Sequence, residues 1–497
     1  MAELGDRPHP PGDYQVVVVG SGPGGLQTSY FLHRRGINHA LISADSAPAG
    51  MFQKFPFFQR LISWTKPYAP AERGTRAYER YDWNSMIGEE PEHRTLLPAL
   101  MDGTSYFPSR DEMERGIALF VERTGLQVRY ECRWESTRQD DNGFVLSTTD
   151  GEYRCRAAIF AMGMTRAWKP DIPGLELVPH YVETRSPKEY TNKKIVIIGK
   201  RNSGFEIADG LLPWARQILL VSPRPARISV VTRSLAGARA RYLQPYEDYV
   251  LAGGTFVLDA ALDHVERNDA GYRVFASGTT HPGDIVLDAD EVIAATGFST
   301  PLLDLPDLGV ATFYSGRLPA QTPFWESASL PGIYFAGSVS QGSIGLKKYG
   351  KTGNSAAVHG FRYNAGVLAN HLAQDRFGMT LKKRSLRPEE VVPYLLEEAT
   401  TAPELYNQPS YLARVLSFND DIIDEGILPL AHFVDSSGPD AVAITVETDD
   451  QSDTHPAVYV RRGARVDEHL LAGDQMLDFR TEEHKNQLAA VLQDVLT

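Results

Sequence analysis

The sequence of 497 residues predicts an α/β fold with two similar parallel-sheet domains and a small α+β appendage at the C-terminus. One observation is a run of four valines that leads into a glycine-rich turn at residues 14–25. A second is a similar apolar run and turn at residues 194–204. Such a run of β-branched residues bounded by glycine is typical of a strand buried on both faces. An internal repeat of one strand–turn–helix unit predicts two domains of the same Rossmann-like kind.

The first glycine-rich turn has the GxGxxG spacing of a dinucleotide-binding motif. Its first glycine allows a tight turn, the second lets the backbone approach a pyrophosphate, and the third lets the following helix pack closely. The helix N-terminus then offers N–H groups and a positive dipole end to the phosphates. The alternative is a purely structural turn, but a helix-like segment at 26–35 and a strand at 39–43 follow in the order the motif requires. The predicted cofactor-binding residues here are Gly20, Gly22, Pro23, Gly24 and Gly25.

The second turn departs from the motif at its middle position, which holds Arg201. A side chain there blocks the backbone approach that glycine permits. Arg201 either contacts a phosphate through its guanidinium group or leaves a degenerate site. The position of the usual ribose-binding acid holds Ser222, and arginines follow it, which favours the 2′-phosphate of NADPH over NADH; the alternative is a solvated arginine surface. The predicted residues of this site are Gly199, Arg201, Asn202, Ser203, Gly204, Ser222, Arg224, Arg227 and Arg233.

Composition narrows the class of protein. With 42% hydrophobic and 23% charged residues the chain is expected to be globular and soluble, and a net charge of −13 argues against a nucleic-acid partner. No apolar run is long enough to span a membrane, and residues 1–13 lack the apolar core of a signal peptide. Cys132 and Cys155 do not form a CxxC pair, so a redox-active dithiol is not expected. We expect a cytoplasmic enzyme without a metal site.

The rest of the chain is divided by an irregular segment and a linker. Residues 44–104 show little periodicity and many aromatics, which favours a functional loop, the alternative being aromatics that pack the loop down. Ser109 is the expected N-cap of a helix, and the prolines and glycine of 169–174 mark a domain crossing. Strands are expected at 127–130, 143–148 and 153–162, and a helix at 355–372. The predicted domains are a flexible tail (1–13), a first dinucleotide-binding domain (14–170 and 295–376), a second (171–294) and a C-terminal domain (377–497).

Two later strands that end in glycine, at residues 294–297 and 332–337, complete a familiar pattern. Together with the two glycine-rich turns they resemble the flavoproteins with two dinucleotide-binding domains. Segments 107–113 and 199–204 are similar to the flavin-containing monooxygenase branch of these proteins. Segments 61–63, 82–85 and 106–108 resemble more closely the endoplasmic-reticulum flavoproteins associated with degradation. The resemblance covers residues 14–375 and extends only faintly into the tail.

The resemblance implies FAD at the first turn and NADPH at the second. Ser43 stands where relatives have a ribose-binding carboxylate, with Asp45 two residues later, and Ser338 stands where many have an aspartate. These departures predict weakened rather than lost FAD binding, since a hydroxyl bonds ribose with less charge assistance. Trp64 is the candidate neighbour of the flavin ring. Further cofactor contacts carried over or inferred by position are Ser43, Gln53, Trp64, Trp134, Gly163, Thr296, Gly297, Gly337 and Ser338.

The same resemblance implies an FAD- and NADPH-dependent monooxygenase. A C4a-hydroperoxyflavin would transfer one oxygen atom to a small molecule, by amine N-hydroxylation first, with sulfide or Baeyer–Villiger oxidation as variants. The branch's flavin-side asparagine has no clean match, so Asn84, Ser63 and Thr65 are the candidate catalytic residues, with capping as the alternative for Asn84. The expected partners are a small-molecule substrate and molecular oxygen, and a homodimer is the default assembly. The alternatives are a flavin oxidase or reductase without oxygen insertion, or a flavin-binding interaction protein.

Overall fold

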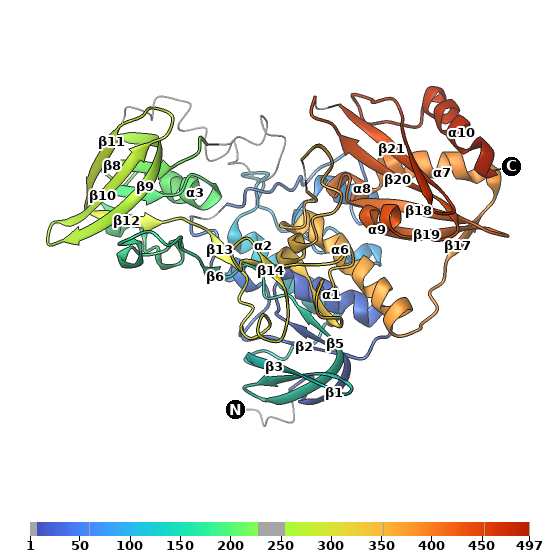
Figure 1. The fold of residues 1–497 in the computed structure, drawn as a ribbon, viewed down its shortest axis with the longest axis horizontal. Coiled ribbons are helices and arrows are strands. Elements are labelled where there is room, and N and C mark those ends of the chain that lie inside the picture. Colours follow the sequence, from blue (N-terminus) through green and yellow to red (C-terminus); the bar gives the residue numbers. More distant parts are fainter. Residues whose placement is uncertain (1–6, 59, 227–253, 351, 452, 497) are drawn as a thin grey trace. The chain divides into compact units, whose positions relative to one another are not determined.

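The computed structural model describes residues 7–58, 60–226, 254–350, 352–451 and 453–496 (Figure 1). The chain forms two compact units. The first contains Met1–Gln53, Ser63–Met164 and Thr300–Thr497, and the second contains Lys54–Ile62 and Thr165–Ser299.

The first unit contains a mixed sheet with strand order β2-β1-β5-β4-β3, and β16 also pairs with β5. The bounds are β1 Gly12–Val19, α1 Pro23–Arg34, β2 His39–Ile42, α2 Arg110–Thr124, β3 Trp134–Asp140, β4 Gly143–Thr148, β5 Gly151–Phe160, β14 Thr312–Phe313, β15 Leu318–Pro319, β16 Ile333–Phe335 and α6 Val358–His371. Strands β1, β2, β5 and β16 run parallel, while β3 and β4 are antiparallel additions. The four valines of β1 are buried, as a strand covered on both faces requires. Helices α1 and α6 pack against each other (Figure 1).

The irregular segment after β2 is organised by short 3-10 turns rather than by regular elements. These turns are η1 Gly50–Gln53, η2 Arg76–Tyr81, η3 Pro91–His93 and η4 Leu97–Ala99. The N-cap prediction at Ser109 is confirmed: its hydroxyl accepts from the Glu112 backbone N–H at 3.1 Å, and the Glu112 carboxylate accepts from the Ser109 N–H at 2.7 Å. The strand predicted at 127–130 is wrong. Only one residue of that segment pairs, Arg129 with Ile42, because the segment passes the end of a four-residue strand.

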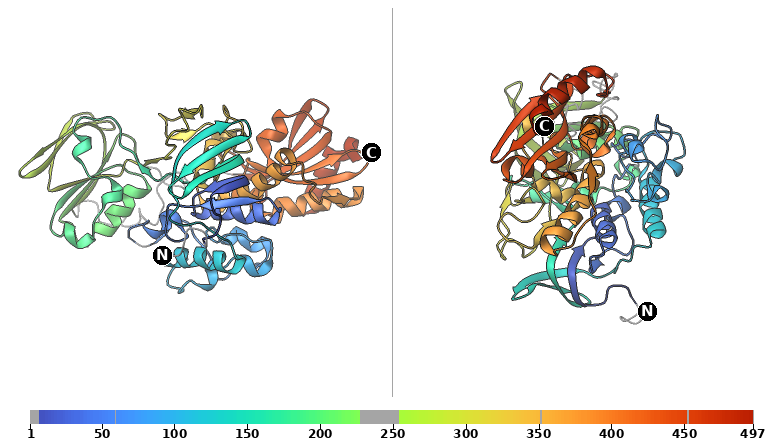
Figure 2. Two further views of the ribbon diagram at one scale, coloured as in Figure 1. Left: turned by 90° about the horizontal axis from the view of Figure 1, so that it is seen from below. Right: turned by 90° about the vertical axis from the view of Figure 1, so that its right-hand side faces the viewer.

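The C-terminal part of the first unit has its own antiparallel sheet, ordered β17-β19-β18-β20-β21-β22 (Figure 2). The bounds are β17 Arg384–Leu386, α7 Pro388–Thr401, α8 Pro403–Asn407, β18 Leu412–Phe418, β19 Ile422–Pro429, α9 Leu430–Asp435, β20 Asp440–Thr448, β21 Thr454–Arg462, β22 Arg465–Leu470 and α10 Glu482–Leu496. This layer contacts the irregular segment through ion pairs. Arg76 of η2 donates to Glu398 at 2.6 Å and to Glu404 at 2.8 Å, and Glu398 also accepts from Arg414 at 2.8 Å.

The second unit contains a sheet ordered β11-β10-β9-β8-β7-β12. The bounds are β6 Arg166–Ala167, β7 Lys194–Ile198, α3 Asn202–Leu211, β8 Gln217–Ser222, β9 Thr255–Asn268, β10 Gly271–Gly278, β11 Asp284–Ala289, β12 Glu291–Ala294 and β13 Phe298–Ser299, with short turns η5 Leu175–Leu177, η6 Tyr181–Glu183 and η7 Pro187–Tyr190. Strands β7, β8, β9 and β12 run parallel, and the strand–turn–helix–strand order of the first unit recurs. The predicted fold class, α/β with two Rossmann-like sheets, is confirmed. Within the described residues, every helix is too short or too polar to cross a membrane.

Candidate functional site

The turn after β1 is shaped by contacts that leave no room for side chains. A Cβ on Gly25 would lie 1.8 Å from the Gly20 carbonyl oxygen, and a Cβ on Gly24 would lie 2.2 Å from the Cα of Gly337. Gly20 has φ +112°, and its added Cβ would lie 2.7 Å from the Ala161 carbonyl oxygen. These glycines therefore allow the packing of α1 onto the strand ends, as the motif predicts.

Gly22 differs from its neighbours, because the protein itself does not require a glycine there. Its φ is −71°, and an added Cβ would meet only the Cα of Gly50, at 4.0 Å. The open side of the turn is a space that a methyl group would fill. Gly22 is the N-cap of α1, Pro23 is the first helical residue, and no side chain caps this helix end. The free N–H groups and the open space fit the pyrophosphate of a dinucleotide.

The carboxylate beside this turn is Asp45, which the sequence analysis did not select as a site residue. The Ser43 hydroxyl at the end of β2 is buried, accepts from Ser21 at 2.8 Å and from the Asp45 N–H at 3.1 Å, and lies 3.3 Å from Asp45 Oδ2. Asp45 is partly exposed. Ser43 thus supports the carboxylate, and Asp45 is better placed to accept from a ribose. Counting a fixed distance from Gly20 missed it by two residues.

Trp134 and Gln53 have internal roles in the first unit. The Trp134 indole is buried in the sheet core, and its Nε1–H donates to Thr137 at 2.9 Å, so only its backbone is left for the predicted adenine contact. The Gln53 amide donates to the carbonyls of Ala47 and Pro48 at 2.9 and 3.0 Å. It fixes the turn that follows Asp45.

Gly163 and Ser338 follow the ends of β5 and β16. Gly163 has φ +67° and Gly337 has φ +68°, conformations that favour glycine. The Ser338 carbonyl accepts from the Gln341 amide at 2.7 Å, and the same amide lies 2.9 Å from the Met164 sulfur. The predicted role of the Ser338 hydroxyl beside the cofactor stays a prediction.

The three candidate catalytic residues come together in the irregular segment. Ser63 Oγ donates to Asn84 Oδ1 at 2.5 Å, and Asn84 Nδ2 donates to Thr65 Oγ1 at 3.1 Å and to the Ser63 carbonyl at 3.2 Å. Asp82, fully buried, accepts from Thr65 Oγ1 at 2.8 Å and from the Asn84 N–H at 3.1 Å. Both amide hydrogens of Asn84 are therefore used in joining two loop segments.

Aromatic rings line the same cluster. Trp64 and Trp83 have ring centroids 4.9 Å apart, and Trp83 stacks on His359 of α6 at 4.3 Å with an interplanar angle of 22°. The rings of Trp64, Trp83 and His359 thus lie next in sequence to, or packed against, the segments that carry the polar cluster. The aromatics thus pack this loop against itself and against α6.

The turn after β7 in the second unit repeats the steric pattern of the first. A Cβ on Gly204 would lie 2.1 Å from the Gly199 carbonyl oxygen, and one on Gly199 would lie 2.3 Å from the Ala295 carbonyl oxygen. Arg201 is the N-cap of α3, with extended backbone and an exposed side chain. Asn202, the first residue of α3, has a buried Oδ1 without a hydrogen-bond partner among the described residues.

The edge of this sheet holds an ion pair that the sequence analysis missed. The Lys200 ammonium is buried, donates to the Leu258 carbonyl at 2.7 Å and forms an ion pair with Asp259. Thr280 donates to the other oxygen of Asp259 at 2.8 Å. Burial alone would raise the pKa of Asp259, but these donors outweigh it and hold the pKa below the ordinary value. The sequence could not indicate this pair, because Lys200 and Asp259 are 59 residues apart and meet only when the sheet forms.

The other predicted residues of the second unit include one at a strand end and two that lie outside the described residues. Ser222 ends β8 and Arg224 is exposed, whereas Arg227 and Arg233 lie outside the described residues. Thr296 donates to the Trp168 carbonyl at 2.6 Å. The Gly297 carbonyl accepts from the Trp168 N–H at 3.1 Å and from the His180 ring at 2.9 Å. Ser203 lies in the first turn of α3.

The two cysteines are buried and free. The Cys132 thiol lies 3.4 Å from the Thr148 hydroxyl, and burial raises its pKa. Burial likewise raises the pKa of Cys155 to about 12. Neither thiol has the low pKa and exposure of a reactive cysteine.

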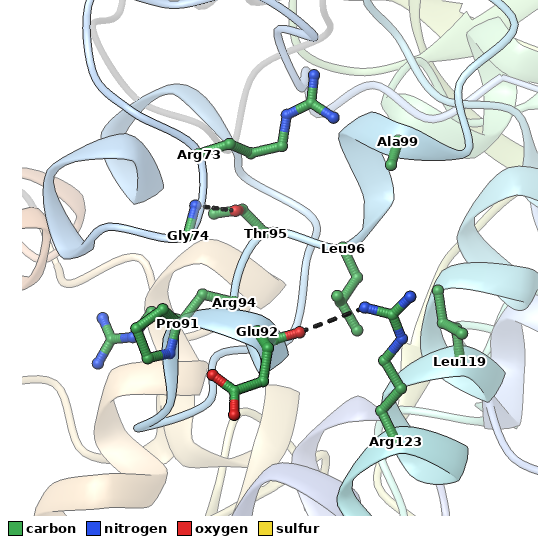
Figure 3. A pocket seen from close by; sticks show the side chains of 10 residues that line it. All are labelled: Arg73, Gly74, Pro91, Glu92, Arg94, Thr95, Leu96, Ala99, Leu119 and Arg123. Atoms are coloured by element: carbon green, nitrogen blue, oxygen red, sulfur yellow. Dashed lines mark hydrogen bonds between the residues drawn. The ribbon is translucent and has the colours of Figure 1, made fainter.

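A separate surface pocket of about 200 Å³ lies beside α2 (Figure 3). Its lining contains none of the predicted site residues. Arg123 reaches the Glu92 carbonyl there at 3.4 Å, and the Gly74 N–H donates to Thr95 at 2.9 Å. The lining residues are Arg73, Gly74, Pro91, Glu92, Arg94, Thr95, Leu96, Ala99, Leu119 and Arg123.

Two Rossmann-like sheets, each with a glycine turn at a helix N-terminus, define a protein of the class with two dinucleotide-binding domains. Comparison with family models agrees, and the chain belongs to the pyridine nucleotide-disulphide oxidoreductase family, whose model matches residues 17–337. The predicted cofactors, FAD and NADP(H), and the predicted flavin oxidoreductase class are confirmed at this level.

Individual relatives differ in what they do. The chain is 25% identical over 448 residues to the mouse FAD-dependent oxidoreductase domain-containing protein 2, covering 84% of this chain and 65% of the relative, which supports the predicted resemblance. A probable indole-3-pyruvate monooxygenase, YUCCA9 of Arabidopsis thaliana, is 24% identical over 386 residues (66% and 85% coverage). A ferredoxin–NADP reductase of Thermus thermophilus is 22% identical over 340 residues (65% and 84%). The chain therefore spans less than two thirds of the length of the first of these relatives.

Solved structures share the fold. A bacillithiol disulfide reductase of Bacillus cereus matches with a TM-score of 0.56 and 20% identity, covering 73% of this chain and all of that one. A flavin-containing monooxygenase of Stenotrophomonas maltophilia matches with a TM-score of 0.54 and 19% identity, covering 73% and 99%. At such identities these likenesses concern the fold alone.

Proposed function

We propose that this chain is an NADPH-dependent flavin monooxygenase that adds one oxygen atom to a small-molecule nucleophile, an amine nitrogen first and a sulfide sulfur second. The observation that carries the proposal is the hydrogen-bonded cluster of Ser63, Thr65 and Asn84 beside the Trp64–Trp83 ring pair, in which Thr65 and Asn84 are buried. Oxygen transfer needs a site that keeps water out and holds fixed polar groups, and the buried side chains and hydrogen bonds of this cluster support such a role. A monooxygenase among the relatives is consistent with it.

FAD, when bound, accepts a hydride from NADPH and activates molecular oxygen. The Gly20–Gly25 turn would hold its pyrophosphate, because the N–H groups at the start of α1 and the space at Gly22 are open. Asp45 would accept from the ribose, with Ser21 and Ser43 orienting its carboxylate. Trp64 would exclude water from the flavin side of the loop cluster.

The second turn would hold NADPH with one altered contact. Gly199 and Gly204 keep the shape of the turn, while the exposed Arg201 would contact phosphate by charge rather than by backbone. The buried, unpartnered Oδ1 of Asn202 can accept a hydrogen bond from the nucleotide or from a bridging water.

The test follows electrons and oxygen together. Purified protein is mixed with NADPH without air, and the loss of flavin absorbance is followed before oxygen and a panel of amines and sulfides are admitted. The proposal expects bleaching and, for one substrate class, about one oxygenated product per NADPH with little hydrogen peroxide. Peroxide in equal amount to NADPH with every substrate would contradict it. The variant Cys132→Ser is the matched control, since retained turnover excludes a mechanism that needs two thiols.

A reductase or oxidase without oxygen insertion is the second candidate, and one observation favours it. Both amide hydrogens of Asn84 are already used within the loop, so this residue can donate to a reacting group only after a bond breaks. Ferredoxin–NADP reductases among the relatives match this reading. In the same experiment it predicts bleaching by NADPH and reduction of an added electron acceptor without any oxygenated product.

The remaining expectations stay predictions. These are the domain boundaries at residues 171, 295 and 377, a homodimer, and a cytoplasmic location. The third alternative, a flavin-binding interaction protein, predicts protein that neither consumes NADPH nor reduces acceptors.

A further inference from the structure

Lys200 reaches across the end of β8, where a nucleotide ribose would lie. Lys200 follows β7, its partner Asp259 lies on β9, and β8 stands between these two strands. Ser222 and Asp259 are register partners, so their side chains share one face of the sheet at its carboxyl edge. In Rossmann-like folds this edge receives the adenosine ribose. The pair therefore occupies the neighbourhood in which NADH and NADPH differ.

The carboxylate of Asp259 has both oxygens occupied. One pairs with the Lys200 ammonium and the other accepts from Thr280 at 2.8 Å. Lys200 is itself held by the Leu258 carbonyl, and its side chain is only 1% exposed, whereas that of Asp259 is 24% exposed. Each carboxylate oxygen thus already has a partner, so a ribose hydroxyl would have to compete with Lys200 or Thr280 for it. The charge of the carboxylate is balanced by a fixed cation.

We propose that Lys200 and Thr280 determine nucleotide selectivity by occupying Asp259, so that the edge tolerates a 2′-phosphate and does not bind a ribose diol. This inference rests on the proposed NADPH site and adds residues that the glycine motif does not contain. An unpaired carboxylate at this edge would repel the phosphate and accept from the diol of NADH. The pair would therefore favour NADPH without touching the phosphate.

The test measures equilibrium dissociation constants of NADP⁺ and NAD⁺ with the holoprotein, so it does not depend on turnover. Lys200→Met keeps most of the side-chain volume and frees the carboxylate. It should lower the selectivity for NADP⁺ over NAD⁺ by about tenfold or more, because the carboxylate loses its neutralising cation and then repels the 2′-phosphate and accepts from the ribose diol. Asp259→Asn should leave the selectivity unchanged or higher, and the double variant should return it close to that of the wild type.

Thr280→Val keeps the test decisive if Lys200→Met does not fold. Thr280 is exposed, so its replacement is tolerated structurally, and it frees one oxygen of Asp259. It should lower the selectivity about two- to threefold. Unchanged selectivity in folded Lys200→Met, or an equal fall in Asp259→Asn, would overturn the inference. If Arg224→Ala alone removes the selectivity while Lys200→Met does not, the exposed arginine is the determinant. A wild type that binds neither nucleotide would instead contradict the proposed function.

Discussion

In the first unit Gly25 lies against the Gly20 carbonyl, and in the second unit Gly204 lies against the Gly199 carbonyl in the same way. The turns differ in what stands between these glycines. The first has an open glycine at 22 and a nearby carboxylate held by serine hydroxyls, whereas the second has Arg201 and a carboxylate neutralised by a buried lysine. Close packing of the helix therefore requires the outer glycines in both turns. The middle residue of the turn and the residues at the strand edge are not under this constraint and can differ with the nucleotide that is bound.

The largest effect is expected where the two turns are alike. Gly25→Ala and Gly204→Ala each place a methyl group about 2 Å from a backbone oxygen, so each should destabilise its own unit by about 3 kcal/mol, the upper end for overpacking. Thermal unfolding followed by flavin absorbance measures this. Gly25→Ala should release FAD, and Gly204→Ala should keep FAD and lose NADPH binding. Loss of FAD from both variants to the same extent would show that the two units do not act separately.

The next largest effect concerns Gly22, where FAD binding and the stability of the fold make different demands on the residue. Gly22→Ala has room in the fold, since its nearest neighbour would be 4.0 Å away, and its φ suits alanine. The apoprotein should unfold at an unchanged temperature, while FAD affinity falls at least about tenfold because the methyl group fills the pyrophosphate space. Titration of apoprotein with FAD measures the affinity. Unaltered affinity would mean that the pyrophosphate does not approach this turn.

A smaller effect is expected at the carboxylate of the first unit. Asp45→Asn keeps the shape of the side chain and removes its charge, so FAD affinity should fall about three- to tenfold. Asp13→Asn, on the N-terminal part of β1, is a matched control and should leave FAD affinity as it is. Equal behaviour of the two variants would remove Asp45 from the site.

The smallest effect is expected for Arg201, the residue at the middle position in which the two turns differ. Arg201→Gly should weaken NADPH about threefold at low salt and have less effect at high salt, because an exposed guanidinium contact is screened. Binding titrations at two ionic strengths measure it. A tighter complex after the substitution would mean that Arg201 obstructs the site rather than serving it.

Most of the fold could be predicted from local sequence patterns, because these depend only on residues that are neighbours along the chain. The valine run, the glycine spacing and the Ser109 capping box each act within a few residues, and each was predictable. The strand expected at 127–130 failed because pairing depends on the length of its neighbour β2. In the site, Asp45 and the Lys200–Asp259 pair were missed because both depend on where strands end and lie side by side. The sequence indicated Ser63, Thr65 and Asn84 only as separate candidates, and it contained no signal that they bond to one another. Their roles in catalysis stay predictions.

The ion pairs of Arg76 with Glu398 and Glu404 join two stretches of chain more than 300 residues apart in sequence. Neither stretch can open without breaking these bonds, so the two should behave as one cooperative unit in native-state hydrogen exchange. The amides of η2 and α7 should then share one opening free energy, although one element is a short turn and the other a long helix. The C-terminal layer would thereby raise the opening free energy of the loop that carries the candidate site.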